Sequence, residues 1–281
     1  MAEQEIAQYL VDAAWLRAHR DNRDIVLIDT RPAADYWAGH LEGARHFDPF
    51  PFHHSDTSEA GLRNFRGQLQ WVFSAIGISG KETVVAYEEN SGMRATRAAW
   101  ALEYMGHPRV RILDGGLGLA AETLVTAAPV VTPANFAESA RDDAIASYAY
   151  IVERIGRADP QVFDVRTDEE YFGERVRARY GGAIPGAIHR DWSANLDARG
   201  AFKPAAQLRA EFARLGLASE REIIPYCQGG YRSANAYIAL RVAGFPRVRN
   251  YLGSWAEWGN HDDLPIDRPR RRASRRDTPP R

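Results

Sequence analysis

Cysteine is almost absent from this sequence, because the 281 residues contain a single one, Cys227. One thiol cannot form a disulfide within the chain, and it cannot build a zinc or iron–sulfur site that needs several cysteines. The neighbouring His53 and His54 have no third ligand within sequence reach, so we expect no metal site. Such sparing use of cysteine fits a reducing compartment.

Long hydrophobic runs are absent as well. No stretch approaches the ~20 apolar residues that a membrane-spanning helix needs. The first ten residues carry Glu3 and Glu5 where a secretory signal would carry basic residues, and no apolar segment follows. We therefore expect a cytoplasmic protein that does not enter a membrane.

The net charge of −1 conceals an uneven distribution along the chain. Residues 268–281 contain seven arginines and one aspartate, a net charge of +6, so the other 267 residues carry a net charge of −7. The segment is rich in proline and has no apolar periodicity, which predicts a disordered tail. We expect it to act as a solvated extension rather than as a nucleic-acid-binding arm.

The sequence repeats itself at an offset of 135 to 143 residues. Four pairs of segments match in the same order, namely Asp29-Thr30-Arg31 with Asp164-Val165-Arg166, residues 39–44 with 182–187, residues 84–88 with 223–227, and residues 106–111 with 244–249. Four matches in the same order predict two related halves, which is also the usual number of domains for a chain of this length.

Each half alternates short β-branched segments with amphipathic ones. Strands are predicted at residues 25–29, 84–87 and 110–113 and at 162–165, 223–226 and 248–251, with helices near 65–76 and 94–105. This alternation predicts an α/β fold in which each domain has a mainly parallel sheet covered by helices on both faces. We place the first domain at residues 1–125, a linker at 126–142 and the second domain at 143–267.

Two equivalent strand ends differ in their chemistry: Tyr226 is followed by Cys227, whereas Tyr87 is followed by Glu88. Ligands of open α/β sheets collect at the carboxyl ends of strands, so we expect Cys227 to mark the functional site. Gly229 and Gly230 allow a tight loop whose N–H groups point at the sulfur, and a helix begins near Ser233. These donors and the helix dipole favour a nucleophilic thiolate over a buried, inert thiol.

Loop length separates two classes of enzyme that place an arginine after such a cysteine. Phosphatases of the Cys-x5-Arg type have a loop wide enough to surround a tetrahedral phosphate. Four residues separate Cys227 from Arg232 here, so the loop is better matched to one extra sulfur atom on the cysteine. A cysteine-dependent phosphatase is the less favoured alternative.

The loop Cys227–Ser233 (CQGGYRS) resembles the active-site loop of the rhodanese family, and the repeat resembles its bacterial-type, tandem-domain thiosulfate sulfurtransferases. The segments GAIPGA (182–187) and GSWAEW (253–258) are similar to family motifs, although Ala183 stands where the family usually has histidine. The resemblance implies a non-catalytic first domain, in agreement with Glu88, and a catalytic second domain that needs no cofactor.

The resemblance further implies that sulfur moves from thiosulfate to cyanide or a thiol through a persulfide on Cys227, with ping-pong kinetics. The loop residues Gln228, Gly229, Gly230, Tyr231, Arg232 and Ser233 would stabilise that persulfide. Two alternatives stay open: a 3-mercaptopyruvate sulfurtransferase, and a non-catalytic persulfide carrier or binding module. The expected partners are a small sulfur donor and a thiophilic acceptor.

Other residues are weaker candidates. Arg175, Arg177 and Arg179 are spaced by two, so an extended segment would point them to one side toward an anionic substrate. Asp164 and Arg166 could form an ion pair that orients the site, although their repeat in the first half favours structural bracing. We expect Trp255 and Trp258 to pack across the domain interface, with Trp255 also able to wall the pocket.

Overall fold

The computed structural model describes residues 9–19 and 21–271. Most of the predicted disordered tail, from residue 272 onward, lies outside the described residues. Its first part is described, and there Arg271 forms an ion pair with Glu174 at 2.9 Å. Within the described part of the chain, no helix combines the length and the apolarity needed to cross a membrane.

The N-terminal half is built on a five-stranded parallel sheet. Its order across the sheet is β1 (Leu10–Val11), β5 (Val110–Leu113), β4 (Thr83–Tyr87), β2 (Ile25–Asp29) and β3 (Arg45–His46). The central strands are rich in valine and isoleucine and are largely buried, as expected for a parallel sheet covered on both faces. Asp29 of β2 pairs with Tyr87 of β4, so both strand ends lie at one edge.

The C-terminal half repeats this order. Here β6 (Ile145–Ala146) and β10 (Asn250–Tyr251) form a two-stranded parallel sheet, and β9 (Ile223–Tyr226), β7 (Gln161–Asp164) and β8 (Ile188–His189) form a three-stranded parallel sheet. A single bridge between Ile223 and Val248 joins β9 to the chain leading into β10. The predicted α/β fold with two related halves is therefore confirmed, although the strand predicted at 248–251 is shorter than expected.

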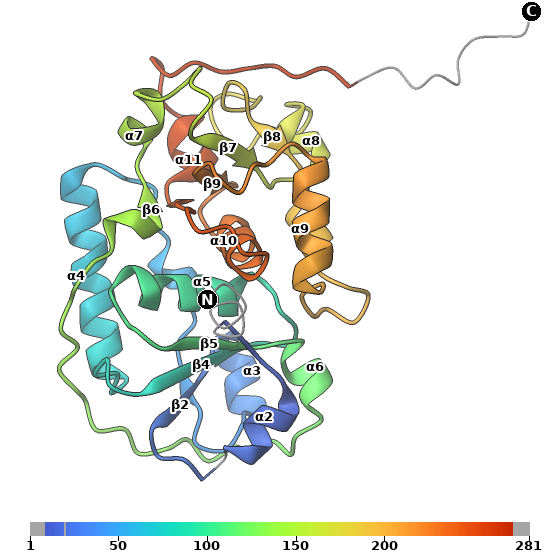
Figure 1. Cartoon of the computed structure of the whole chain (residues 1–281). Coiled ribbons are helices and arrows are strands. Elements are labelled where there is room, and N and C mark those ends of the chain that lie inside the picture. Colours follow the sequence, from blue (N-terminus) through green and yellow to red (C-terminus); the bar gives the residue numbers. More distant parts are fainter. Residues whose placement is uncertain (1–8, 20, 272–281) are drawn as a thin grey trace, which may run out of the picture.

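Helices cover the sheets of both halves (Figure 1). In the N-terminal half they are α2 (Ala13–Ala18), α3 (Ala33–Ala38), η1 (Phe50–Phe52), α4 (Glu59–Ala75), α5 (Met93–Tyr104) and α6 (Gly116–Ala120). The C-terminal half has η2 (Asp142–Ala144), α7 (Tyr148–Val152), α8 (Asp168–Tyr171), η3 (Trp192–Asn195), α9 (Ala205–Arg214), α10 (Arg232–Val242) and α11 (Ser254–Trp258). Helix α4 starts earlier than predicted because the Ser58 side chain caps it, accepting a hydrogen bond from Gly61 N.

Helices α5 and α10 pack against each other between the two sheets (Figure 1). Both are rich in alanine and buried over most of their length, which lets their backbones approach closely. Asn235 of α10 donates its side-chain N–H to the carbonyl oxygens of Ser91 and Gly92 in the other half. The interface is therefore both apolar and specifically hydrogen-bonded.

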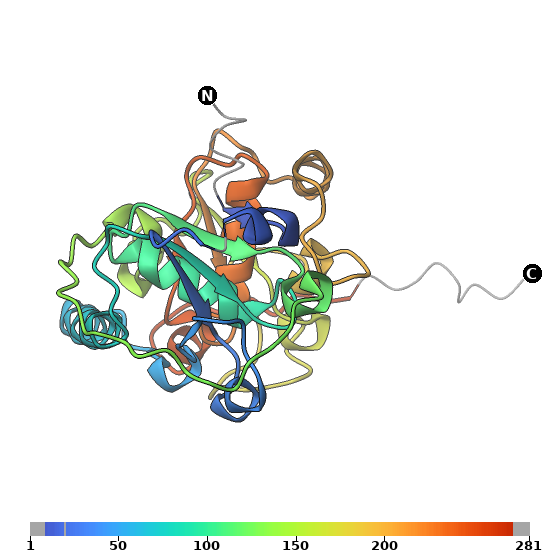
Figure 2. The same cartoon turned by 90° about the horizontal axis from the view of Figure 1, so that it is seen from below.

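The chain between the halves packs against the N-terminal half. The segment that we predict as a linker, residues 126–142, crosses the outside of the N-terminal half (Figure 2). Its Phe136 is buried and packs edge-on against Phe73 of α4, with the ring centroids 5.5 Å apart.

The two halves are also joined directly by Glu257 of α11, whose carboxylate accepts two hydrogen bonds of 2.6 Å from Thr57.

Candidate active site

Cys227 is the first residue after β9, and the loop that follows it returns to the start of α10 at Arg232. The cysteine is 1% exposed. Gly230 has a φ of +83°, which favours glycine, and a Cβ atom there would lie 2.7 Å from the Leu252 carbonyl oxygen. The loop therefore has its tight course only because position 230 lacks a side chain.

Ser254, at the start of α11, anchors this loop. Its Oγ accepts hydrogen bonds of 3.1 Å from the backbone N–H groups of Cys227 and Gly230, and it donates to the Tyr251 carbonyl oxygen. Ser254 itself has a φ of +52°, an uncommon value for a residue with a side chain. The residue lies within the GSWAEW segment that the sequence points to, but its role was not predicted.

The pKa of the Cys227 thiol is lowered from its ordinary value of 9.0. Burial raises the pKa, but the Arg232 charge and the backbone N–H groups of Ser233 and Gly229 outweigh it. The position at the end of β9 and the start of α10 thus favours the nucleophilic thiolate, as the sequence led us to expect.

Arg232 both braces the loop and places positive charge near the sulfur. Its guanidinium forms a two-pronged ion pair with Glu170 of α8, at 2.5 and 3.0 Å, while its charge also acts on Cys227. Glu170 is buried, and Arg232 and the Thr167 backbone hold the pKa of this carboxyl at about 2 despite its burial. Glu170 is a site residue that sequence reasoning did not find.

Asp164 and Arg166 form a buried ion pair at the end of β7, with Arg166 Nη2 2.6 Å from Asp164 Oδ2 and 2.7 Å from the Gly182 carbonyl oxygen. In the first half, Arg31 Nη2 lies 2.6 Å from Asp29 Oδ2. The same geometry occurs in the half without the cysteine. This agreement favours bracing of the strand ends over a direct part in the chemistry.

The three spaced arginines do not lie on one side of an extended strand, because residues 174–180 form irregular structure. Arg179 pairs with Asp262 at 2.6 Å. Arg177 approaches Glu170 at 3.4 Å, and its carbonyl oxygen accepts a hydrogen bond from Gln228 of the cysteine loop. The Arg175 side chain is exposed. Arg177 is thus the member of this group in contact with the loop.

Trp255 and Trp258 lie in the hydrophobic core of the C-terminal half, so the prediction that they pack across the domain interface is wrong. They belong to α11, which is held against β9 and β10 of its own half. The Trp255 N–H of the backbone donates to the Cys227 carbonyl oxygen at 3.0 Å, and its indole donates to Tyr180. Trp255 is only 1% exposed and packs beneath the cysteine loop, on the side of the hydrophobic core.

The N-terminal half supplies residues on the other side of the loop. The Tyr231 ring stacks on Phe50 with centroids 4.5 Å apart, and its hydroxyl donates to the Pro49 carbonyl oxygen. The partly exposed His53 ring lies so close to Gly229 that a Cβ there would meet His53 Cε1 at 2.5 Å. Sequence reasoning could not place these residues at the site because more than 170 positions separate them from Cys227.

The equivalent position in the N-terminal half is filled by a carboxylate. Glu88 Oε1 accepts hydrogen bonds from the backbone N–H groups of Arg94 and Ala95, at 2.8 and 2.9 Å, at the start of α5. Burial raises the pKa of Glu88 to about 7, against the pull of these two donors. Arg94 follows Glu88 by six residues, just as Ser233 follows Cys227. In both halves, the backbone N–H at this helix start donates to the side chain that ends the strand.

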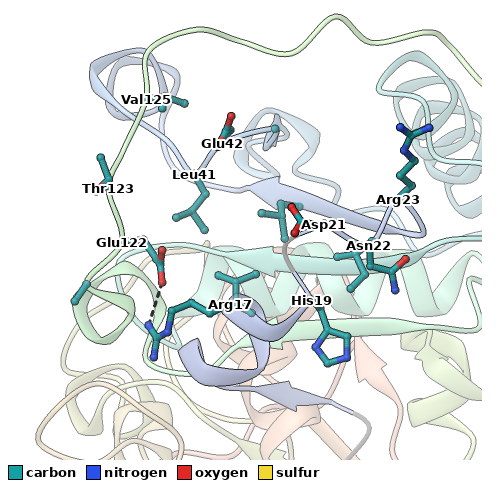
Figure 3. Close-up of a pocket in the computed structure, with 15 residues that line it drawn as sticks. Arg17, His19, Asp21, Asn22, Arg23, Leu41, Glu42, Glu122, Thr123 and Val125 are labelled. Carbon is teal, nitrogen blue, oxygen red and sulfur yellow. Dashed lines mark hydrogen bonds and ion pairs between the residues drawn. The ribbon is translucent and has the colours of Figure 1, made fainter.

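Three cavities formed by the described residues lie away from Cys227. One of them, of about 760 Å³, lies between α2 and the segments around Leu41 and Thr123 (Figure 3), and its lining includes none of the predicted site residues. Two others of about 630 and 300 Å³ also exclude Cys227. Across residues 9–19 and 21–271, no three His, Cys, Asp or Glu side chains converge as they would around a metal ion. Because Cys227 is only 1% exposed, a reagent must reach a closely covered sulfur.

Comparisons with known proteins agree with this geometry. The model of the rhodanese-like domain matches twice, at residues 12–119 and 147–261. The chain is 35% identical over 261 residues to a thiosulfate sulfurtransferase of Azotobacter vinelandii, covering 92% of this chain and 96% of the relative. It is 30% identical to the sulfur carrier protein TtuD of Thermus thermophilus, with the same coverage.

A solved structure of wild-type EanB shares the fold, with a TM-score of 0.81 and 21% sequence identity. The match covers 94% of this chain and 70% of EanB.

Proposed function

The chain belongs to the rhodanese-like family, and from this membership we propose that it is a thiosulfate sulfurtransferase whose sulfur-accepting group is Cys227. The observation that carries the proposal is the environment of this thiol. A buried sulfur at the start of α10, whose pKa is lowered by Arg232 and by backbone and side-chain donors, is prepared to carry negative charge. Relatives of 34–35% identity over most of the chain bear the name of this activity.

The reaction that we propose has two displacements at sulfur. The Cys227 thiolate attacks the outer sulfur of thiosulfate, the sulfur–sulfur bond of thiosulfate breaks, and sulfite leaves with the bonding electrons. Cyanide or a thiolate then attacks the outer sulfur of the Cys227 persulfide and restores the thiolate. No electrons are gained or lost overall, and the order of release predicts ping-pong kinetics.

The residues around the sulfur support distinct roles in this scheme. The N–H groups of Gly229 and Ser233 would stabilise the anion on Cys227 before and after sulfur transfer. Arg232, held by Glu170, supplies positive charge near the sulfur. Arg177 and Arg175 are exposed on the segment beside Gln228 and could attract a dianion, whereas Arg179 is engaged with Asp262. Asp164 and Arg166 would keep the strand ends in place.

The test is an assay of thiocyanate formation with cyanide and two donors, thiosulfate and 3-mercaptopyruvate, given separately. We expect higher turnover with thiosulfate and complete loss of turnover in Cys227→Ser. Turnover that survives this substitution would contradict the role of Cys227. Faster turnover with 3-mercaptopyruvate would instead assign the alternative donor.

A second candidate, a persulfide carrier, is favoured by the similarity to a relative named as a sulfur carrier protein. Intact-mass measurement after exposure to thiosulfate shows one added sulfur in either case. A carrier would hold that sulfur with little release to cyanide, whereas an enzyme turns over many times. Phosphatase activity without sulfur transfer would instead support the remaining alternative, a cysteine-dependent phosphatase.

The proposal extends to the partners, the location and the domain boundaries of the enzyme. Its partners would be a small sulfur donor and a thiophilic acceptor, and the reactive thiol suits the reducing cytoplasm. We place the non-catalytic domain at residues 1–125, the linker at 126–142 and the catalytic domain at 143–267. Limited proteolysis that cuts first within 126–142 would support these boundaries.

A further inference from the structure

Arg97 of α5 is a fully buried cation in the half of the molecule that lacks the cysteine. The residue is 1% exposed, and among the residues that the structure describes no carboxylate forms an ion pair with it. Its Nη1 donates to the Gly230 carbonyl oxygen at 3.3 Å, and its Nη2 has no hydrogen-bond partner within that part of the chain. The guanidinium is thus aimed at the cysteine loop.

Aromatic rings form the rest of its surroundings. The guanidinium carbon lies 4.6 Å from the centroid of Trp100, 5.0 Å from that of Tyr231 and 5.4 Å from that of Phe65. Such contacts offset part of the cost of removing a charge from water, but they do not replace a counter-ion. Burial accordingly lowers the pKa of Arg97 to about 10.

The ionisable groups near Arg97 and the sulfur come from three segments. Arg232 of α10 already pairs with Glu170, and burial and the charge of Arg97 lower the pKa of His53, which disfavours the cationic form of this ring. Burial raises the pKa of Tyr231, which keeps its hydroxyl protonated at neutral pH. Cys227 is the remaining group that can become an anion beside Arg97.

We propose that Arg97 is a positioning residue that supplies, from the N-terminal half, the buried positive charge balancing the anion on Cys227. The inference rests on the proposed function, because the same charge would balance both the thiolate and the persulfide anion of sulfur transfer. The two halves then share one charged centre, with the cation on α5 and the anion at the start of α10. The half without a cysteine is thereby part of the site.

The coupling between the two residues must be reciprocal. If Arg97 stabilises the ionised sulfur, the ionised sulfur equally stabilises the buried Arg97. Removing the sulfur leaves a cation without a balancing charge, which is costly in a protein interior. Removing the cation costs little stability but leaves the sulfur harder to ionise.

The test compares Arg97→Met, which keeps an apolar stem of similar length, with Arg97→Lys, which keeps the charge. The rate of alkylation of the single cysteine by iodoacetamide is followed against pH by intact mass. We expect Arg97→Met to raise the midpoint of this profile by about one pH unit or more, which slows alkylation about tenfold at neutral pH. Arg97→Lys should keep the midpoint close to that of the wild-type protein.

The matched control is Arg66→Met, which removes a different arginine of the N-terminal half, one that pairs with Glu138 at 2.6 Å. This variant should leave the alkylation midpoint unchanged. If Arg97→Met also leaves the midpoint unchanged while lowering the melting temperature, Arg97 has a structural role alone and the inference is wrong.

A thermal double-mutant cycle gives a second readout that does not depend on activity. Cys227→Ser should lower the melting temperature of the wild-type protein at alkaline pH more than it lowers that of Arg97→Met. Equal effects in the two backgrounds would overturn the inference. Absence of sulfur transfer in the wild-type protein would defeat the proposed function, yet the alkylation profiles would still decide whether Arg97 and Cys227 are coupled.

Discussion

Ser254 holds Cys227 in place through a single oxygen atom, although 27 positions separate the two residues in sequence. The Ser254 hydroxyl accepts the Cys227 N–H at 3.1 Å and also that of Gly230, so one side chain fixes both ends of the tight part of the loop. Its Oγ lies 4.0 Å from the sulfur, which makes the hydroxyl part of the sulfur's surroundings as well. The geometry of the nucleophile is therefore set by α11 and not by its own loop alone.

Replacing this hydroxyl should damage the loop. We expect Ser254→Ala to leave two buried N–H groups without their acceptor and to lower the free energy of unfolding by about 1–3 kcal/mol. Sulfur transfer from thiosulfate should slow about tenfold, measured as persulfide formation in a single turnover. Ser254→Gly is the matched variant, because it also lacks the hydroxyl but accepts the φ of +52° without strain. Glycine should thus be the more stable of the two while being equally slow, and full activity in both would contradict the role.

The two loop glycines should respond differently to alanine. Gly230→Ala places a Cβ 2.7 Å from a backbone oxygen at a φ of +83°, so we expect a loss of about 2 kcal/mol or more in stability and loss of activity. Gly229→Ala meets the His53 ring instead, and that partly exposed ring can turn aside. Chemical denaturation and the thiosulfate assay on both variants check the contrast. Equal damage at the two positions would mean that the His53 ring is held rigidly.

The pair formed by Arg232 and Glu170 predicts a specific acid sensitivity. The pKa of Glu170 is about 2 in the folded protein and 4.5 ordinarily, so its contribution to stability is complete above pH 4.5 and is lost as the pH falls toward 2. Glu170→Gln should cost about 2 kcal/mol at neutral pH, since it leaves the Arg232 guanidinium without its buried counter-ion. The difference in unfolding free energy between the two proteins should shrink below pH 4.5. A difference that stays constant with pH would show that the charge of Glu170 is not what stabilises the protein.

Ionisation of Cys227 predicts a dependence of stability on alkaline pH. Because its pKa is lower in the folded protein than the ordinary 9.0, the thiolate contributes stability that is fully present above pH 9.0 and is lost as the pH falls through the folded pKa. The unfolding free energy of the wild-type protein minus that of Cys227→Ala should therefore rise with pH across this interval. A difference that falls with pH would mean that the folded protein disfavours the thiolate.

The sequence allowed the repeat, the strand ends and the loop of Cys227 to be predicted because these features are local. Glycines, a helix start and a strand end within a few residues mark such a loop in the sequence. His53, Arg97 and Ser254 could not be placed at the sulfur, because their positions depend on how α5, α11 and the segment after η1 pack. The alternation expected of Arg175, Arg177 and Arg179 required a strand, and residues 174–180 do not form one.

Glu88 makes the two related loops unequal. Its carboxyl oxygen accepts from the donors at the start of α5, so these N–H groups are already engaged within the chain. The loop of Glu88 also receives the Gly200 carbonyl oxygen of the other half at the Ser91 N–H. Of the two related loops, the one with Cys227 would alternate between thiolate and persulfide in the proposed cycle, whereas the corresponding donors of the other loop are taken by a side chain of the protein itself.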